Sequence, residues 1–286
     1  MNMKTGIVLE GGASRTLYSC GILDAMLDNG IFLDYVAGTS AGISYGVSYI
    51  SRQSGRNLEI AEKYMEDKRY MGVSHLLNRK NRSYYNLDFV FYEIPERLVP
   101  FDFDAYAKYG AEAYGALTNI ETGKTEYMRV PAEDRKWNVL RASCALPLLF
   151  QPIEIAGKLY MDGGITDSIP FEYALTQGGC HKVIVLLTRE ESYQKKKESL
   201  TPLVKAAYPK YPKLAEALAN RHIMYNSQLQ KLKELEKDGK ALVLRPDSTH
   251  NISRTEKKSS VLVPFYKEGY EKGIKNIERI REFIEK

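Results

Sequence analysis

The pattern of hydrophobic and polar positions changes period repeatedly along this chain. Short apolar runs between glycine and polar residues predict strands, and apolar residues three or four positions apart predict helices. Strands are expected at residues 5–10, 33–38, 111–120, 123–130, 153–164, 181–189 and 241–246. Helices are expected at residues 14–30, 41–53, 133–144, 170–179, 214–237 and 255–286, together with a helical, aromatic-rich segment at 57–106.

This alternation of strands and helices indicates the α/β class. It predicts a mainly parallel central sheet with helices on both faces. The sequence contains no internal repeat and no clean domain boundary, so we expect one domain over residues 1–286. Its core is expected at about residues 5–188, and a helical C-terminal extension at about residues 200–286, after a loop-like segment that begins at Arg189.

Composition agrees with an ordinary globular protein, with 44% hydrophobic and 27% charged residues in 286. No apolar run approaches the roughly 20 residues that span a bilayer. The opening MNMKTGIVLEGG has too short an apolar run for a signal peptide, so we interpret it as the first strand. Three widely spaced cysteines predict neither a disulfide framework nor a metal cluster, and they favour a reducing cytoplasm.

The net charge of +5 is unevenly distributed. From Arg189 onward the chain has 22 basic and 14 acidic residues, whereas the remainder has 19 basic and 22 acidic residues. Such a basic region is typical of solvated helix faces, and it also fits peripheral contact with an anionic membrane surface. No nucleic-acid-binding motif accompanies the charge, so we expect no nucleic-acid partner.

The most informative motif is G-x-S-x-G, at Gly38, Ser40 and Gly42. It lies where a predicted strand meets a predicted helix, which is the context of a nucleophilic serine on a sharp turn. Small flanking residues allow close approach of the chain, and the helix N-terminus directs N–H groups toward the serine. A tight structural connector would have the same pattern, so the motif alone leaves both interpretations open.

A serine hydroxyl becomes a good nucleophile when a base accepts its proton. None of the four histidines lies in a segment with evident catalytic character, and a carboxylate can replace histidine as the base. The best candidate is Asp162, which a predicted strand brings to a turn at Gly163 and Gly164. An Asx turn without catalytic function would use the same residues.

A third motif follows the first predicted strand, at Gly11–Gly12–Ala13, with Arg15 in the first turn of the next helix. This loop can direct backbone N–H groups at one anionic oxygen, as acyl transfer requires. A phosphate-binding loop or a plain strand–helix turn remains an alternative. The patterns of the Walker A loop and the dinucleotide-binding loop are both absent.

Taken together, these motifs resemble those of the patatin-like phospholipase family, lipid acyl hydrolases with a Ser–Asp dyad. The glycine loop, G-x-S-x-G and Asp-Gly-Gly occur in the family's order, and RASCALPLLFQPIEIAGKLYMDGG resembles the segment that leads to its aspartate. The similarity covers about residues 5–187. It implies a three-layer α/β/α sandwich, no cofactor or metal, and a lipid or acyl-ester substrate.

The resemblance also implies roles for individual residues. Ser40 corresponds to the nucleophile and Asp162 to its base, with an acyl-enzyme intermediate on Ser40. The oxyanion hole would be formed by Gly11, Gly12 and Ala13. Arg15 would either brace the glycine loop or contact a lipid phosphate.

Two positions depart from the family pattern, because Ala13 and Thr16 stand where the family usually has glycine. An alanine at a positive φ would be strained, and bulk at Thr16 could hinder packing against the nucleophile helix. Two alternatives to a dyad hydrolase are therefore retained. One is a non-catalytic lipid-binding regulator, and the other is a Ser–Asp–His α/β-hydrolase that would use His181, His222 or His250.

Overall fold

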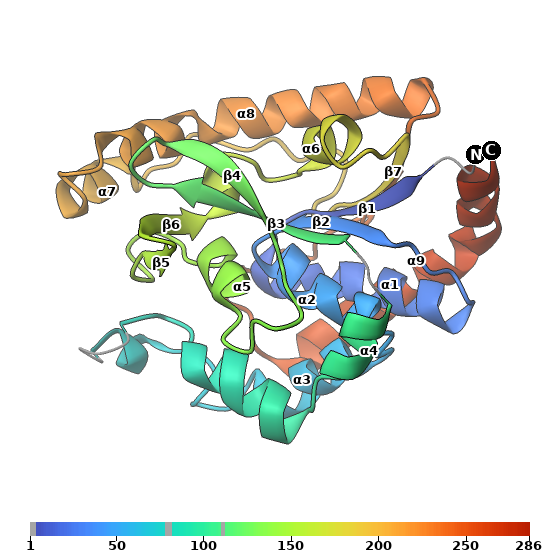
Figure 1. The fold of residues 1–286 in the computed structure, drawn as a ribbon, viewed down its shortest axis with the longest axis horizontal. Helices are drawn as coiled ribbons and strands as arrows, with labels where there is room; N and C mark the ends of the chain where they lie inside the picture. Colours follow the sequence, from blue (N-terminus) through green and yellow to red (C-terminus); the bar gives the residue numbers. More distant parts are fainter. Residues whose placement is uncertain (1–3, 78–81, 110–111) are drawn as a thin grey trace.

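The computed structural model describes residues 4–77, 82–109 and 112–286. Its centre is an eight-stranded sheet in the order β5-β6-β3-β2-β1-β7-β8, and β4 pairs with β3 off this path (Figure 1). The strands are β1 Thr5–Leu9, β2 Tyr35–Thr39, β3 Glu112–Asn119, β4 Lys124–Arg129, β5 Ile153–Ile155, β6 Lys158–Asp162, β7 Lys182–Leu186 and β8 Ala241–Leu244.

Parallel pairing dominates the middle of this sheet. The pairs β1–β2, β1–β7, β2–β3 and β7–β8 are parallel, and those that involve β4, β5 and β6 are antiparallel. The expected mainly parallel α/β sheet is therefore confirmed. The C-terminal β8 extends the same sheet, so the region beyond residue 200 contributes to the central layer as well as to the helices.

The sheet separates two helical layers (Figure 1). Alternate residues of β1 show this, since Ile7 and Leu9 pack into one buried cluster and Val8 into another. The helices that surround the sheet are α1 Leu17–Asp28, α2 Ala41–Ile50, α3 Arg56–Tyr64, α4 Phe103–Lys108, α5 Asn138–Ser143, α6 Phe171–Thr176, α7 Thr201–Ala207, α8 Pro212–Lys237 and α9 Ser259–Glu285. The expected α/β/α layering is confirmed, with α6 and α8 on the face opposite α1, α2 and α9.

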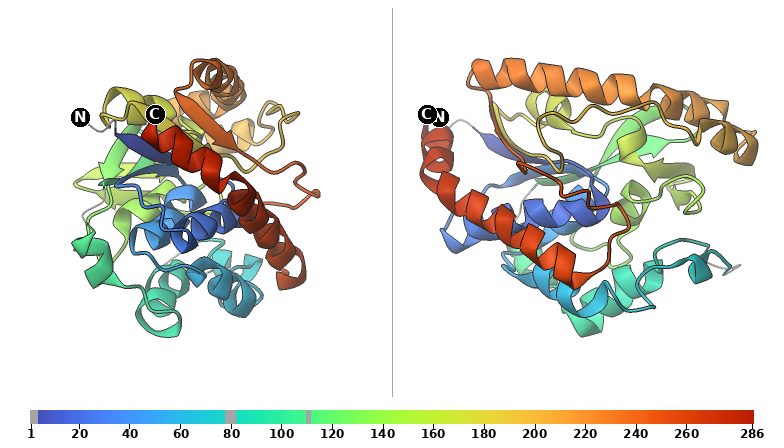
Figure 2. Two further views of the ribbon diagram at one scale, coloured as in Figure 1. Left: turned by 90° about the vertical axis from the view of Figure 1, so that its right-hand side faces the viewer. Right: turned by 180° about the vertical axis from the view of Figure 1, so that it is seen from behind.

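The C-terminal helix α9 lies along α1 (Figure 2). Small residues allow this close contact, because a Cβ added to Gly21 would lie 2.2 Å from the carbonyl oxygen of Tyr266. A Cβ on Gly269 would lie 2.0 Å from the carbonyl oxygen of Tyr18. Substitution of either glycine would therefore push the two helices apart.

Several predicted boundaries differ from the structure. The helix expected at 14–30 begins as the 3₁₀ turn η1, Ala13–Thr16, and continues as α1. The helix expected at 133–144 begins only at Asn138, because Trp137 has a left-handed backbone with φ 56°. Parts of the predicted segments 1–12, 57–106 and 111–120 lie outside the described residues. The aromatic segment contains α3, the 3₁₀ helix η2 (Val73–Leu77), the π-helix η3 (Phe89–Leu98) and α4.

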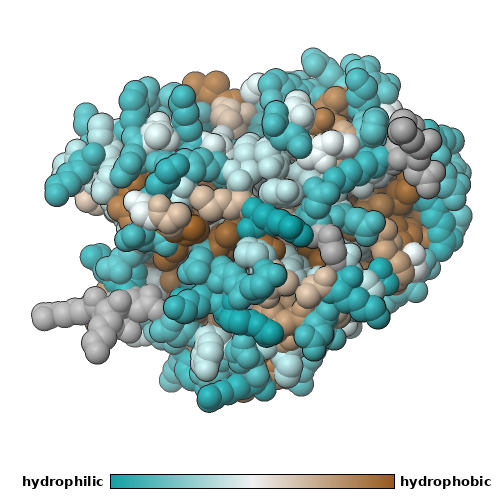
Figure 3. Space-filling model, viewed as in Figure 1, coloured by the Kyte–Doolittle hydropathy of each residue, from teal (hydrophilic) through white to brown (hydrophobic). Residues whose placement is uncertain are grey.

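Among the described residues, no helix combines the length and the apolar character that crossing a membrane requires. The face seen in Figure 3 is mostly hydrophilic, with hydrophobic residues gathered in its recessed parts.

Candidate active site

The strand pairing of β3 brings Ser40 and Asp162 together. Along one edge of β3, Ala116 pairs with Thr39 of β2, and the next residue, Leu117, pairs with Asp162 of β6. The ends of β2 and β6 therefore meet on neighbouring residues of the same strand. Ser40 follows Thr39 directly, so the topology places its side chain beside Asp162.

Ser40 lies on a strained turn between β2 and α2. Its backbone has φ 55° and ψ −131°, a region that non-glycine residues rarely adopt. Such a conformation costs on the order of 1–3 kcal/mol and persists where the surrounding structure enforces it. The backbone N–H of Ser40 donates a 2.8 Å hydrogen bond to Oγ of Ser143, and that hydroxyl donates to the carbonyl oxygen of Ala116. Ser143 therefore fixes the turn to β3.

The motif glycines are required by close contacts at this turn. A Cβ on Gly38 would lie 2.7 Å from the backbone nitrogen of Ile43, and one on Gly42 would lie 2.6 Å from the carbonyl oxygen of Leu9. A Cβ on Gly163 would lie 2.0 Å from the carbonyl oxygen of Ala116. These positions hold the Ser40 turn and the Asp162 turn against the sheet, where any side chain would collide with backbone.

Asp162 is buried, with 2% of its surface exposed. Its Oδ1 accepts a 2.7 Å hydrogen bond from the N–H of Gly164, and the hydroxyl of Ser40 faces the carboxylate as a hydrogen-bond donor. Burial raises the pKa of Asp162 above its ordinary value, and Arg221, Ser40 and Arg254 act in the opposite direction. A raised pKa makes this carboxylate a stronger base than an exposed aspartate.

The glycine loop lies directly over the serine. A Cβ on Gly11 would be 2.8 Å from the carbonyl oxygen of Thr39 and 3.0 Å from Cβ of Ser40. Within the described structure, no hydrogen-bond acceptor is present for the backbone N–H groups of Gly11, Gly12 and Ala13. These amides are therefore available to bind a negatively charged oxygen that forms next to Ser40.

Ala13 adopts a positive φ of 49°, so the departure from glycine does place an alanine in the left-handed region. The second departure, Thr16, is accommodated in the interior with 1% of its surface exposed. Ser14 anchors this loop to the C-terminal region, because its backbone N–H and its hydroxyl both reach the carbonyl oxygen of Arg254. The glycine loop is thus held by a segment far away in sequence.

Arg15 is 4% exposed and donates from Nη1 to the carbonyl oxygen of Ile252. It also lines the polar cavity at Ser40, which contains Asp162 and the glycine loop. Burial, with help from the nearby cations Arg189 and Arg254, lowers the pKa of Arg15 to about 10. Its position therefore fits both roles considered from the sequence, bracing the loop and facing a substrate anion.

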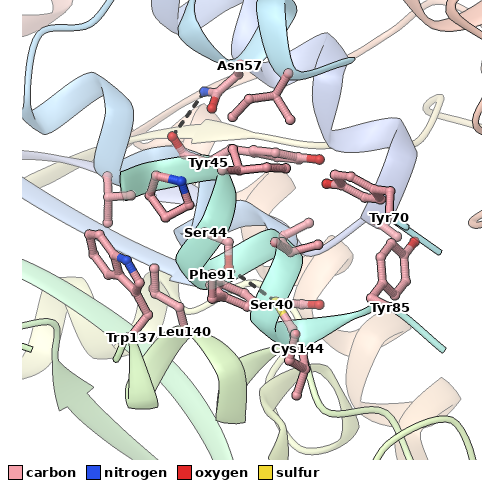
Figure 4. A pocket seen from close by; sticks show the side chains of 18 of the residues that line it. Ser40, Ser44, Tyr45, Asn57, Tyr70, Tyr85, Phe91, Trp137, Leu140 and Cys144 are labelled. Carbon is pink, nitrogen blue, oxygen red and sulfur yellow. Dashed lines mark hydrogen bonds between the residues drawn. The ribbon is translucent and has the colours of Figure 1, made fainter. Parts of the chain in front are cut away.

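Two cavities meet at Ser40. The first is apolar, has a volume of about 990 Å³ including its open mouth, and runs beside α2 from Ser40 past Ser44 to Val47. Figure 4 shows Ser40 and Cys144 at one end of the drawn residues and Asn57 at the other. Most of its opposite wall comes from the aromatic segment at 57–106, including Tyr70, Tyr85, Leu87, Phe91, Ile94 and Phe101.

The second cavity is polar and shares Ala13, Ser40 and Leu146 with the first. Of the charged residues that line this cavity, the sequence motifs identified Arg15 and Asp162. They did not identify the other five, which are Glu10, Arg189, Lys195, Arg221 and Arg254. Arg221 and Arg254 lie more than 180 residues from Ser40 and carry no local motif, so no sequence signal identified them. Ser143, which binds the N–H of Ser40, does have a sequence signal. It belongs to RASCALP, the start of the segment that resembles the family's approach to the aspartate.

None of the four histidines lines either cavity in the described structure. His181 precedes β7 at the surface, His222 bonds to the carbonyl oxygen of Ala219, and His250 pairs with Glu268. Within the described residues, no group of three or more His, Cys, Asp or Glu side chains is arranged to hold a metal ion.

The chain is similar to known proteins over most of its length. A family model described as patatin-like phospholipase matches residues 7–175, and a second, described as a domain of unknown function (DUF6363), matches residues 211–285. The protein of Escherichia coli (strain K12) named "Uncharacterized protein YjjU" is 25% identical over 195 residues, which cover 66% of this chain and 54% of that protein.

Fungal lysophospholipases are also similar. Lysophospholipase NTE1 of Yarrowia lipolytica is 27% identical over 180 residues, covering 60% of this chain and 12% of that protein. Lysophospholipase NTE1 of Meyerozyma guilliermondii is 29% identical over 196 residues, which cover 64% of this chain and 12% of that protein. The chain thus spans about half of the bacterial relative and a small part of the fungal ones. The solved structure of VipD from Legionella pneumophila is 11% identical, with a TM-score of 0.45 over 98% of this chain and 67% of that one.

Proposed function

Because this chain belongs to the patatin-like phospholipase family, we propose that it is a serine acyl hydrolase of the phospholipase A or lysophospholipase type. Ser40 attacks the acyl carbonyl while Asp162 accepts its proton, and Asp162 then gives this proton to the leaving oxygen, so that an acyl-enzyme forms, the alcohol is released and the carboxylate is regenerated. Water then attacks the acyl-enzyme with Asp162 as base, which releases the fatty acid and restores Ser40. The observation that carries the proposal is that Ser40, on its strained turn, faces the buried carboxylate of Asp162.

The environment of this pair supports the same reaction. Negative charge develops on the carbonyl oxygen during attack, and the free amides of Gly11, Gly12 and Ala13 lie where they can bind it. The apolar cavity accepts an acyl chain from the side of α2, and the polar cavity accepts the alcohol part of the ester. A lipid ester likewise combines an apolar acyl chain with a polar alcohol part.

Labelling with a fluorophosphonate tests the nucleophile. We expect one adduct on the intact protein, none on Ser40→Ala, and labelling of Ser44→Ala, which removes another hydroxyl of the same cavity. Asp162→Asn is expected to reduce hydrolysis of p-nitrophenyl esters nearly as far as Ser40→Ala, because the amide cannot accept the proton. Full labelling of Ser40→Ala would show that the nucleophile is another residue.

The same experiment separates the alternatives. A lipid-binding regulator on this fold predicts no adduct on Ser40 and no esterase activity. A Ser–Asp–His hydrolase predicts that substitution of His181, His222 and His250 abolishes activity. Their positions outside both cavities favour retained activity in the triple variant.

We also propose peripheral contact with anionic membranes from a cytoplasmic location. The basic C-terminal third supports the contact, as do Leu200 and Leu203, which are 47% and 57% exposed at α7. Three free cysteines support a reducing compartment. Binding to phosphatidylglycerol vesicles is expected to weaken as salt is added, and salt-independent binding would contradict an electrostatic contact.

A further inference from the structure

The polar cavity beside Ser40 contains more positive than negative charge. Five cationic residues line it, and they come from η1, the loop after β7, α8 and the loop after β8: Arg15, Arg189, Lys195, Arg221 and Arg254. The two carboxylates in the same lining are Glu10 and Asp162. A surplus of cations in a partly enclosed space is unfavourable unless an anion joins them.

The carboxylates of this lining are already engaged. Glu10 accepts hydrogen bonds from the N–H and the hydroxyl of Thr188 and from the hydroxyl of Tyr225. Asp162 accepts from Gly164 and faces Ser40. Neither carboxylate forms an ion pair within 4 Å with a lining cation in the described structure.

Four of the five cations have no carboxylate partner. Arg221 lies 3.7 Å from Glu198, whereas the others have no carboxylate oxygen within 4 Å among the described residues: Arg15, Arg189, Lys195 and Arg254. Arg221 is itself 9% exposed, and its Nε lacks a hydrogen-bond partner there. A buried guanidinium with an unused donor can donate a hydrogen bond to an anionic oxygen in this cavity.

The cations also affect one another. Burial together with Arg221 and Arg254 lowers the pKa of Lys195 to about 7. Only groups that lie close together in a poorly solvated space repel in this way. A bound anion would remove the repulsion and restore the charged form of the lysine.

We propose that this cluster is a subsite for the phosphate of the leaving group, so that the substrate is an acyl ester of a glycerol phosphate with no cationic head group. The proposal rests on the proposed hydrolase function and specifies its substrate class. Phosphate fits because its oxygens can accept several charge-assisted hydrogen bonds at once. It belongs to the leaving group because the acyl side of Ser40 faces the other, apolar cavity.

The cavity disfavours a choline or ethanolamine head group. Among the described residues of the lining, both carboxylates already accept hydrogen bonds, so neither is free to pair with an added ammonium group, and the cations would repel it. Two aromatic rings beside these cations already have a cation over one face. Lys195 lies 4.4 Å from the ring centroid of Tyr225, and Arg189 lies 4.3 Å from that of Tyr193.

The region matched by the second family model supplies Arg221 and Arg254 to this subsite. Its α8 places Arg221 against the aspartate turn, since Nη2 lies 3.1 Å from a Cβ built on Gly164. The segment at 252–256 holds the glycine loop through Ser14. The C-terminal region therefore completes the head-group side of the site.

Kinetics on the full chain test the substrate class. We expect kcat/KM for 1-oleoyl-glycerol 3-phosphate to exceed that for 1-oleoyl-glycerophosphocholine and for 1-oleoylglycerol. Arg254→Gln and Lys195→Gln should each lower the ratio of phosphate to neutral substrate about 10-fold or more, the effect of losing a charge-assisted hydrogen bond. The exposed neighbours Lys257→Gln and Lys196→Gln should leave the ratio unchanged. If Arg254→Gln and Lys195→Gln lower kcat/KM equally on all three substrates, the proposal is overturned.

Binding measurements separate this proposal from the hydrolase assignment. By calorimetry, Ser40→Ala should bind glycerol 3-phosphate, and Arg254→Gln in that background should weaken binding about 10-fold. If Ser40→Ala binds but the wild type cleaves no ester, the hydrolase assignment fails and the phosphate site stands. If inorganic phosphate binds as tightly as glycerol 3-phosphate, the site holds free phosphate rather than a head group. If neither binds, there is no phosphate site.

Discussion

The backbone N–H of Ser40 donates a 2.8 Å hydrogen bond to Oγ of Ser143, a residue 103 positions away. The same hydroxyl donates to the carbonyl oxygen of Ala116. Ser143 is buried with 0% of its surface exposed, so no water can readily replace it. It links the Ser40 turn to β3, the strand that also positions Asp162.

Ser143→Ala should therefore reduce catalysis without removing either member of the dyad. We expect kcat for p-nitrophenyl butyrate to fall about 10-fold, because the turn loses its fixed position, with KM nearly unchanged. Two buried groups lose a partner, so unfolding free energy should fall by about 1–3 kcal/mol. Ser143→Thr, which keeps the hydroxyl, should recover part of kcat. A loss confined to stability would show that Ser143 has no positioning role.

Ala13 provides a test of backbone strain in the glycine loop. Its φ of 49° lies in the left-handed region, where alanine is less favourable than glycine by about 1 kcal/mol. Ala13→Gly should raise the unfolding free energy by up to about 1 kcal/mol in urea denaturation. The esterase rate should stay within about threefold, because the amide remains in place.

Ala156 supplies a matched control for that change. It has φ 50°, lies exposed in the turn between β5 and β6, and is remote from both cavities. Ala156→Gly should give a similar gain in stability with an unchanged rate. If Ala13→Gly lowers stability while Ala156→Gly raises it, contacts of the Ala13 methyl group outweigh the backbone strain.

The sequence predicted much of the fold and the residues at the centre of the candidate site. Local periodicity located β1, α1, β2 and α2, and three short motifs identified the glycine loop, Ser40 and Asp162. These features are recognisable because glycine turns and strand–helix junctions leave local patterns. The contact between Ser40 and Asp162 itself depends on how three strands share β3, which periodicity does not encode.

The cationic side of the site could not be predicted. Arg221 is one polar position on a long amphipathic helix, and Arg254 lies in a loop, so both resemble ordinary surface residues in the sequence. Only tertiary packing of α8 and the loop after β8 brings them to Asp162. The late start of α5 likewise follows from the left-handed backbone of Trp137, which no propensity scale indicates.

In the proposed reaction, the pH dependence of ester hydrolysis follows from the environment of Asp162. The base must be ionised, and burial raises its pKa above the ordinary value of 3.8. Therefore kcat/KM for a neutral ester should fall as pH decreases through this raised pKa. The ionisable groups around the carboxylate are Arg221 from α8, Arg254 from the loop after β8 and the thiol of Cys144 after α5.

Arg254 lowers the pKa of Asp162, so its removal has a predictable sign. In Arg254→Gln the pKa should rise further, and the acidic limb of the kcat/KM profile should move to higher pH. Lys257→Gln, which changes an exposed charge in the same loop, should leave the limb in place. A limb that stays fixed or moves to lower pH in Arg254→Gln would show that Asp162 does not control it.

The apolar cavity predicts a limit on the length of the acyl chain. It follows α2 from Ser40 to Val47, and seven residues of α-helix span about 10 Å. Val47→Phe would fill the end remote from the nucleophile, because Val47 lines the cavity and is 3% exposed. Activity on p-nitrophenyl palmitate should fall about 10-fold or more relative to p-nitrophenyl butyrate. Overpacking costs about 1–3 kcal/mol, so a thermal melt must show a folded variant. An unchanged ratio of the two rates in a folded Val47→Phe protein would show that the acyl chain leaves Ser40 by another path.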